Sequence, residues 1–199
     1  AASGEGVLWR LLDAAATGNK PPAEAVCAAV EADPRAATRP FAKPAGWEPV
    51  EGALVRLRPG LREKNGLRAG ELATVTRVNS DGQRFHVKRF GDKRFGDNKR
   101  CDYIPAADLA HGFDGWLPLH AAAALALDEE ALLLLLEAHT AAAATAGAAG
   151  QYPLHLAASA GADKEALLLL LEAHTAAAAT ADAGGEYPFE LLPSRASDG

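Results

Sequence analysis

The chain has 199 residues, a hydrophobic share of 49% and a formal net charge of −6. No apolar run approaches the roughly 18 to 20 residues that cross a bilayer, because the longest leucine-rich stretch is interrupted by Asp128, Glu129 and Glu130, and then by Glu137. We therefore expect a soluble or peripheral protein. The two cysteines, Cys27 and Cys101, show no Cys-x-x-Cys spacing, which favours reduced thiols and an intracellular compartment.

The first segment, residues 7–38, reads as a pair of helices. Its sequence LLDAAATGNKPPAEAVCAAVEADPRAAT is rich in alanine and leucine, and Gly18 and two prolines separate its halves. Alanine and leucine are strong helix formers, whereas Gly and Pro interrupt helices. We predict two short helices that lean on the rest of the chain.

Residues 39–112 have a different composition and predict strands. Alanine becomes sparse, β-branched and basic residues alternate, and Gly or Pro recurs at short intervals, a pattern typical of short strands and turns. Asp81-Gly82 is a strong hairpin signal. Because closure removes unpaired edges from a small sheet, we expect a closed barrel. The expected strands are 53–57, 71–78, 84–89 and 101–104.

The last segment, residues 113–193, nearly repeats itself. The sequence that begins at Asp114 with DGWLPLH recurs from Ala149, and a third copy starts at Gly184 and stops after EYPFELLP. In the second copy a helix should begin at Pro153 and stop at Gly161, with a second helix from about Lys164 to His174. Units of this size cannot bury their own apolar faces, so tandem copies predict a stack.

Two resemblances follow from these residues. The second copy, GQYPLHLAASAGADKEALLLLLEA, resembles an ankyrin repeat, which implies an α-solenoid of helix pairs that binds proteins. The usual threonine of the opening is replaced by Leu117, Tyr152 and Tyr187, so its turn hydrogen bond must be lost or met differently. The stretches LVRLRP, GLRAGELATVTRV and YIPAADL resemble an SH3-like barrel.

The expected fold class is therefore α+β: an ankyrin-like α-solenoid of helix pairs with a small all-β SH3-like barrel inserted near the N-terminus. The expected domains are a degenerate helix pair at 7–38, the barrel at 39–112 and the repeats, two complete and one truncated, at 113–193. We expect the barrel to pack against the helices through Trp116 or Trp47.

The net charge also differs between residues 39–112 and the rest of the chain. Residues 39–112 carry 15 Lys or Arg against 9 Asp or Glu, a net +6, and the remainder carries −12. The positive charge concentrates in KRFGDKRFGDNKR, from Lys88 to Arg100, which could meet an acidic protein surface, phosphate or an anionic headgroup. The alternative is a solvated hairpin loop that faces the acidic helices of the same molecule. The candidate partner-binding cations are Lys88, Arg89, Lys93, Arg94, Lys99 and Arg100.

The leucine runs 132–136 and 167–171 predict an apolar interaction surface. Steps of 100° send five successive side chains around the whole helix, so each run needs cover on several sides. The second run faces a truncated copy and should lack a complete neighbour, which makes Leu168 a candidate partner-binding residue. Trp116, Tyr152 and Tyr187 at the loop tips are further candidates, although each could instead pack against the next turn.

Metal binding and catalysis are not expected. His120 and His155 repeat with the period and so lie too far apart to share an ion; we expect both to bond backbone groups. The chain contains no Gly-x-Ser-x-Gly, no HExxH and no complete phosphate-binding loop. We expect no cofactor and no enzymatic activity.

The function that these patterns favour is a non-enzymatic scaffold or linker subunit that holds a larger assembly together. One alternative is a peripheral, soluble-side subunit of a plastid or mitochondrial membrane complex, since the start AASGEG and the lack of methionine suit removal of a targeting peptide. A second alternative is a nucleic-acid or ribosome-associated protein that acts through the basic segment, including Arg84.

Overall fold

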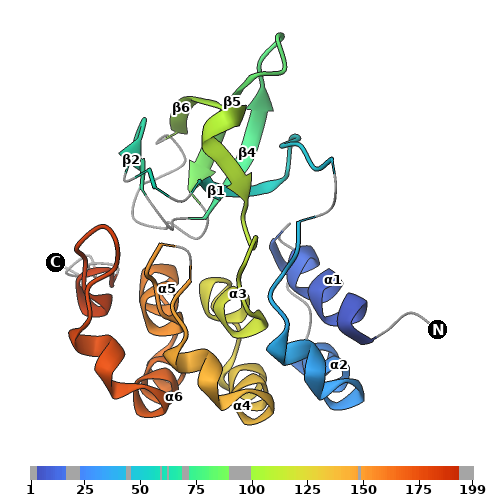
Figure 1. Cartoon of the computed structure of the whole chain (residues 1–199), viewed down its shortest axis with the longest axis vertical. Coiled ribbons are helices and arrows are strands. Elements are labelled where there is room, and N and C mark those ends of the chain that lie inside the picture. Colours follow the sequence, from blue (N-terminus) through green and yellow to red (C-terminus); the bar gives the residue numbers. More distant parts are fainter. Residues whose placement is uncertain are drawn as a thin grey trace, which may run out of the picture.

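The computed structural model describes residues 4–16, 23–43, 46–58, 60–61, 63–68, 72–89, 100–147 and 149–192. These residues combine α-helices, short 3₁₀-helices and an antiparallel sheet (Figure 1). The α-helices are α1 (Gly4–Ala16), α2 (Ala23–Ala32), α3 (Pro118–Ala124), α4 (Glu129–Ala138), α5 (Pro153–Ala160) and α6 (Lys164–Ala173). The 3₁₀-helices are η1 (Pro34–Thr38), η2 (Ala106–Asp108), η3 (Thr140–Ala144), η4 (Thr175–Ala179) and η5 (Pro188–Glu190).

The strands lie between α2 and α3 in the chain. They are β1 (Leu54–Leu57), β2 (Glu63–Lys64), β3 (Leu67–Arg68), β4 (Ala73–Val78), β5 (Arg84–Arg89), β6 (Arg100–Pro105) and β7 (Leu109–His111). Five of them form an antiparallel sheet in the order β6-β5-β4-β1-β7, and β2 pairs with β3. The predicted hairpin at Asp81-Gly82 is confirmed: it joins β4 to β5, and the Asn79 amide donates to the Arg84 carbonyl over 3.0 Å.

The expected closed SH3-like barrel is wrong, because the sheet is open, with β6 and β7 as its two ends. The physical reason is that this sheet buries its apolar face without closing. Phe85, Val87 and Ile104 lie in one buried cluster with Leu67, which comes from the small β2–β3 hairpin. A hairpin that contributes to the core covers apolar surface, so curling the sheet into a barrel is not required.

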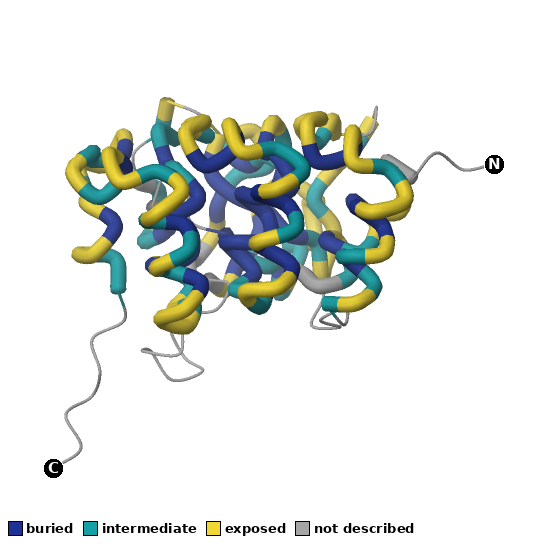
Figure 2. Tube along the Cα trace, turned by 90° about the horizontal axis from the view of Figure 1, so that it is seen from below, coloured by how far each residue is buried: buried dark blue, intermediate teal, exposed yellow. Residues whose placement is uncertain are grey.

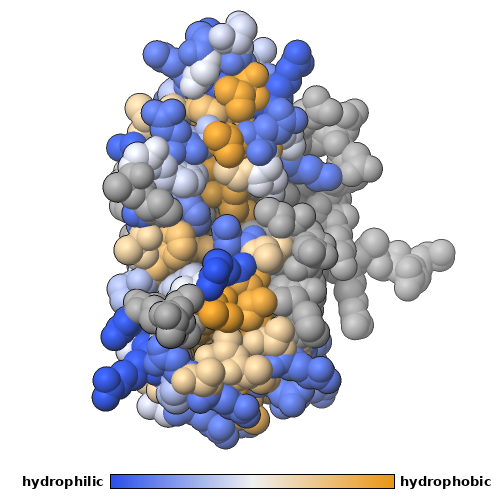
Figure 3. Space-filling model, turned by 90° about the vertical axis from the view of Figure 1, so that its right-hand side faces the viewer, coloured by the Kyte–Doolittle hydropathy of each residue, from blue (hydrophilic) through white to orange (hydrophobic). Residues whose placement is uncertain are grey.

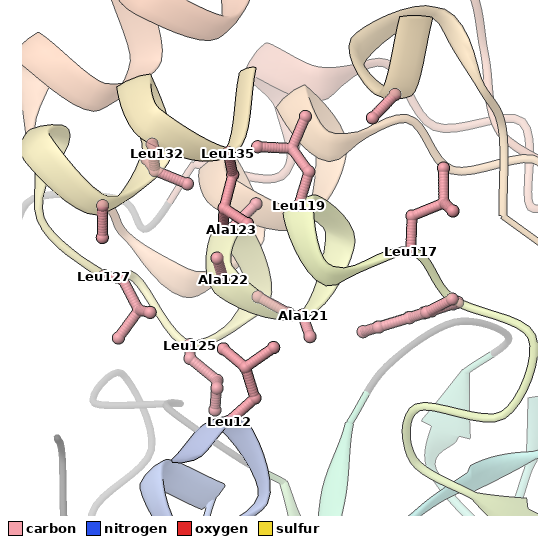
Figure 4. Close-up of a cluster of buried hydrophobic side chains, with 14 of the residues drawn as sticks. Leu12, Leu117, Leu119, Ala121, Ala122, Ala123, Leu125, Leu127, Leu132 and Leu135 are labelled. Carbon is pink, nitrogen blue, oxygen red and sulfur yellow. The ribbon is translucent and has the colours of Figure 1, made fainter. Parts of the chain in front are cut away.

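The helices form a layer below the sheet in Figure 1. One row contains α1, α3 and α5, and the other contains α2, α4 and α6. The duplicated segments lie side by side, since α3 contacts α5 and α4 contacts α6. Figure 2 shows that buried residues gather in the middle of this layer, and Figure 4 shows why α3 is central: its small alanines let leucines from α1 and α4 approach closely.

The resemblance to ankyrin repeats is wrong as a description of this chain. The described residues form six α-helices with an open five-stranded antiparallel sheet, and not the helix-pair solenoid that the resemblance implied. The copied sequence specifies local elements well, because Pro153 begins α5 and Gly161 ends it with a φ of 68°. Local elements do not fix the architecture into which they assemble. The domain boundaries at 38 and 112 stay a prediction.

The sheet meets the helices at a buried arginine. Arg56 of β1 is 2% exposed; its Nε donates to the Gly112 carbonyl over 3.0 Å and its Nη2 donates to the Asp114 carbonyl. The guanidinium also lies 5.5 Å from the ring centre of Trp116. Burial lowers the pKa of Arg56, and the nearby Asp114 opposes this shift. Trp116 thus contacts the sheet, as expected.

Aromatic rings fill the rest of this junction. His111 of β7 stacks on Phe41, with ring centres 4.4 Å apart, and meets the edge of Trp47 at 5.1 Å. Phe41 in turn packs against Trp9 of α1 at 5.0 Å. The backbone of Phe41 exchanges two hydrogen bonds with the turn before α3, so the sheet and the helices share one continuous contact region.

We expect Arg56→Met to lower the free energy of unfolding by about 2 to 4 kcal/mol, because it leaves buried carbonyls without their donors. Chemical denaturation monitored by circular dichroism measures this. Arg58→Met is the matched control: Arg58 also donates to a carbonyl, that of Leu109 over 3.0 Å, but it is an exposed residue. Equal losses in the two variants would contradict the role of Arg56.

Candidate protein-binding surface

An apolar groove lies at the end of the helical layer formed by α6 and η5. It has a volume of about 750 Å³. Its walls come from the turn before α6, from one face of α6 and from the chain around η5. The lining residues are Gly161, Ala162, Asp163, Lys164, Leu167, Leu168, Leu171, Phe189 and Leu192.

The duplication shows which part of this face is unusual. Helices α4 and α6 share the sequence EALLLLLEA, so equal positions can be compared. Leu132 and Leu136 of α4 are buried, whereas the equivalent Leu167 and Leu171 of α6 are only partly buried. Helix α4 lies between α2 and α6, but α6 has α4 and α5 as its main helical neighbours among the described elements. The difference marks the face of α6 that no further α-helix of the described residues covers.

The exposure of Leu168 has a different cause from that of Leu167 and Leu171. Its side chain is 44% exposed, and the equivalent Leu133 of α4 is 43% exposed. The leucine at this position therefore points outward in both helices, so the truncated third copy is not the cause of its exposure. What distinguishes the two is their surroundings, because Leu168 lines the groove and Leu133 is not among its lining residues.

The third copy forms the other wall. Phe189 of η5 is 47% exposed, and Tyr187 just before it is 44% exposed. The Tyr187 amide donates to the Glu190 carboxylate over 3.0 Å, and in the second copy the Tyr152 amide donates to His155 Nδ1 over 3.3 Å. In the second and third copies, the turn bond expected from the missing threonine is thus met by the side chain three residues later.

The other two loop-tip candidates are less accessible. Trp116 is 1% exposed and packs against Phe113, with ring centres 6.1 Å apart. Tyr152 is half-buried, and its ring lies 5.1 Å from that of His174. Of the three predicted aromatic residues, Tyr187 is the exposed one, but it does not line the groove.

The basic segment is described only at its ends. Lys88 is exposed on β5. Arg89 and Arg100 lie in β5 and β6, but their side chains are outside the described residues, as are Lys93, Arg94 and Lys99 altogether. Leu167 and Leu171 are predicted only as members of the leucine run 167–171, and Phe189 is not predicted as a binding residue. A comparison of equal positions in the copies, where neighbours differ, is the signal that could have found them.

The repeated histidines bond the backbone, as predicted. His120 Nε2 donates to the Thr145 carbonyl over 2.8 Å, and His155 Nε2 donates to the Thr180 carbonyl over 3.0 Å. Burial lowers the pKa of His120 to about 4; the bond to Thr145 opposes that shift and Arg56 adds to it. Burial also lowers the pKa values of His111 and His155. Burial therefore favours the neutral form of all three histidines in the folded chain.

We expect stability to fall as the pH drops. A histidine whose folded pKa is below its unfolded value contributes fully above pH 6.5 and loses that contribution as the pH falls through the folded pKa. For His120, a shift from 6.5 to about 4 corresponds to roughly 3 kcal/mol.

Urea denaturation at a series of pH values between 7 and about 4 measures this loss. His120→Gln keeps a donor for the Thr145 carbonyl and removes the titrating ring, so its free energy of unfolding should fall less steeply. An unchanged pH dependence in this variant would contradict the assignment.

No family model matches the chain, and no curated protein matches it. Among the described residues, no cluster of three or more His, Cys, Asp or Glu side chains is arranged to hold a metal ion. None of the helices in the described part of the chain has the length and apolarity to cross a membrane.

Proposed function

We propose that this chain is a non-enzymatic interaction subunit that holds another protein against the groove between α6 and η5. The observation that carries the proposal is the contrast between the copies, in which leucines buried in α4 are left partly open in α6. Contiguous apolar surface that stays in contact with water is the usual mark of a protein interface.

The energetics support a partner at this position. Covering one leucine side chain completely contributes roughly 1.5 to 3 kcal/mol, and Leu167, Leu168 and Leu171 each retain exposed surface. Phe189 adds an aromatic side chain, a type enriched where binding energy concentrates. A partner that fills the groove would gain from all four residues at once, which suits a linker subunit in a larger assembly.

A second candidate function concerns the outer face of the sheet. Phe85 and Val87 of β5 are buried, while Arg84 and Lys88 alternate with them and are exposed. Arg77 of the neighbouring β4 is also exposed. Arg84 is ion-paired with Asp81 over 3.3 Å, so the case for an anionic partner depends mainly on Arg77 and Lys88, with an acidic protein surface ahead of RNA because the chain as a whole is acidic.

The proposed function is tested with two variants of equal exposure. We expect Leu168→Asp to abolish co-purification of the partner from the native source, because a carboxylate in the groove cannot be desolvated without large cost. Leu133→Asp should retain the same partner. Quantitative mass spectrometry of the two preparations measures the difference, and circular dichroism checks that both fold. Loss in both variants, or in neither, would remove the groove from the proposal.

The second candidate is tested by salt dependence. A chain that uses the outer sheet face should bind a single-stranded RNA oligonucleotide or an acidic peptide with an affinity that falls steeply as salt rises. We expect Arg77→Glu with Lys88→Glu to weaken the binding by about tenfold or more and to flatten the salt dependence. Fluorescence anisotropy measures both. Binding that ignores salt and the double substitution would exclude this face.

A further inference from the structure

Among the described elements, no α-helix follows α6 in the helical layer. The third copy supplies η5, which contacts α5 and η4 and so occupies the place next to α5 that α5 occupies next to α3. The place next to α6 has no such occupant among the described elements: the groove there is bounded by Leu167, Leu171 and Phe189. The space has the position of a second helix in the third copy.

The chain shows what covers this kind of face. Val26 and Val30 of α2 align with Leu132 and Leu136 of α4 and with Leu167 and Leu171 of α6. The first two pairs are buried, and in each case another helix follows: α4 contacts α2, and α6 contacts α4. The third pair is the one left partly open. An α-helix is therefore the element that completes the pattern.

Helices α4 and α6 share one pair of buried positions, which we call the seam. Ala131 and Leu135 are buried in α4, and the equivalent Ala166 and Leu170 are buried in α6. A small residue followed four positions later by leucine places both side chains on one helix face. The alanine leaves room for the bulky side chains of the helix it meets, as ridges fit grooves in helix packing.

The exposed charges around the groove favour basic residues on the flanks of the bound helix. Asp163, Glu165, Glu172 and Glu190 are exposed on α6 and η5, against Lys164 as the cation of this group. A helix whose seam is flanked by Lys or Arg would meet complementary charge, which raises the association rate and disfavours acidic competitors.

We propose that the groove binds an amphipathic α-helix of another protein, with alanine and leucine four residues apart in its seam and basic residues on its flanks. This inference rests on the proposed function and names its partner by chemistry. A second copy of the chain fits less well, because the segments outside 39–112 carry a net −12.

The face that includes α1 shows separate apolar patches bordered by hydrophilic residues (Figure 3).

The probe is a labelled synthetic peptide with the sequence of residues 162–180, in which Glu165→Lys and Glu172→Lys supply the basic flanks. We expect it to bind the full chain and to lose about tenfold or more in affinity towards Leu168→Asp. Leu133→Asp should bind like the unaltered chain. Phe189→Ser tests the other wall. Because Phe189 lies in η5 and not in α6, this variant does not depend on how α6 tolerates a charge, and it too should weaken binding.

Three outcomes would overturn the inference. Equal affinity for the unaltered chain and Leu168→Asp would place the peptide elsewhere, and equal affinity of the peptide that keeps both glutamates would reject the basic flanks. A dimer of the chain that Leu168→Asp abolishes, seen by light scattering, would make a second copy the occupant. If the peptide does not bind while Leu168→Asp alone loses its co-purifying protein, the proposed function stands and the helical occupant is rejected.

Discussion

Five consecutive leucines on one helix impose the constraint on which this molecule depends. Successive residues are 100° apart, so a run of five surrounds the helix and no single neighbour can bury it. In α4 most of the run is covered by α2, α3 and α6, and Leu133 stays exposed. In α6 the inner side is met by α4 and α5, and the outer side ends in the groove with η5. The arrangement of helices and the open face follow from the same geometry.

Much of the local structure could be predicted from particular residues. Proline at 153, glycine at 161 and aspartate at 163 define the ends of α5 and the start of α6, because each acts through its own backbone or side chain. The hairpin at Asp81-Gly82 is of the same kind. These signals depend on neighbours within a few residues, and they are right for that reason.

The larger assembly could not be predicted in the same way. Closure of the sheet depends on what covers its apolar face, and Leu67 in the small β2–β3 hairpin contributes to that cover from outside the five strands. The junction depends on Arg56, which reads in the sequence as one more basic residue on a strand. Only its partners, the carbonyls of Gly112 and Asp114 far along the chain, reveal it as a buried contact.

The groove contains one residue whose orientation could be predicted from the sequence and others whose importance could not. Leu168 could be predicted as outward-facing from helix geometry, but its exposure equals that of Leu133 and so carries little information alone. Leu167 and Leu171 are informative because their equivalents are buried when a helix follows. Both side chains pack in part against the helical core, so each contributes to the fold as well as to the groove. The surface that they keep exposed, next to Leu168, is the part of α6 that the described residues leave uncovered and that the proposed occupant would cover.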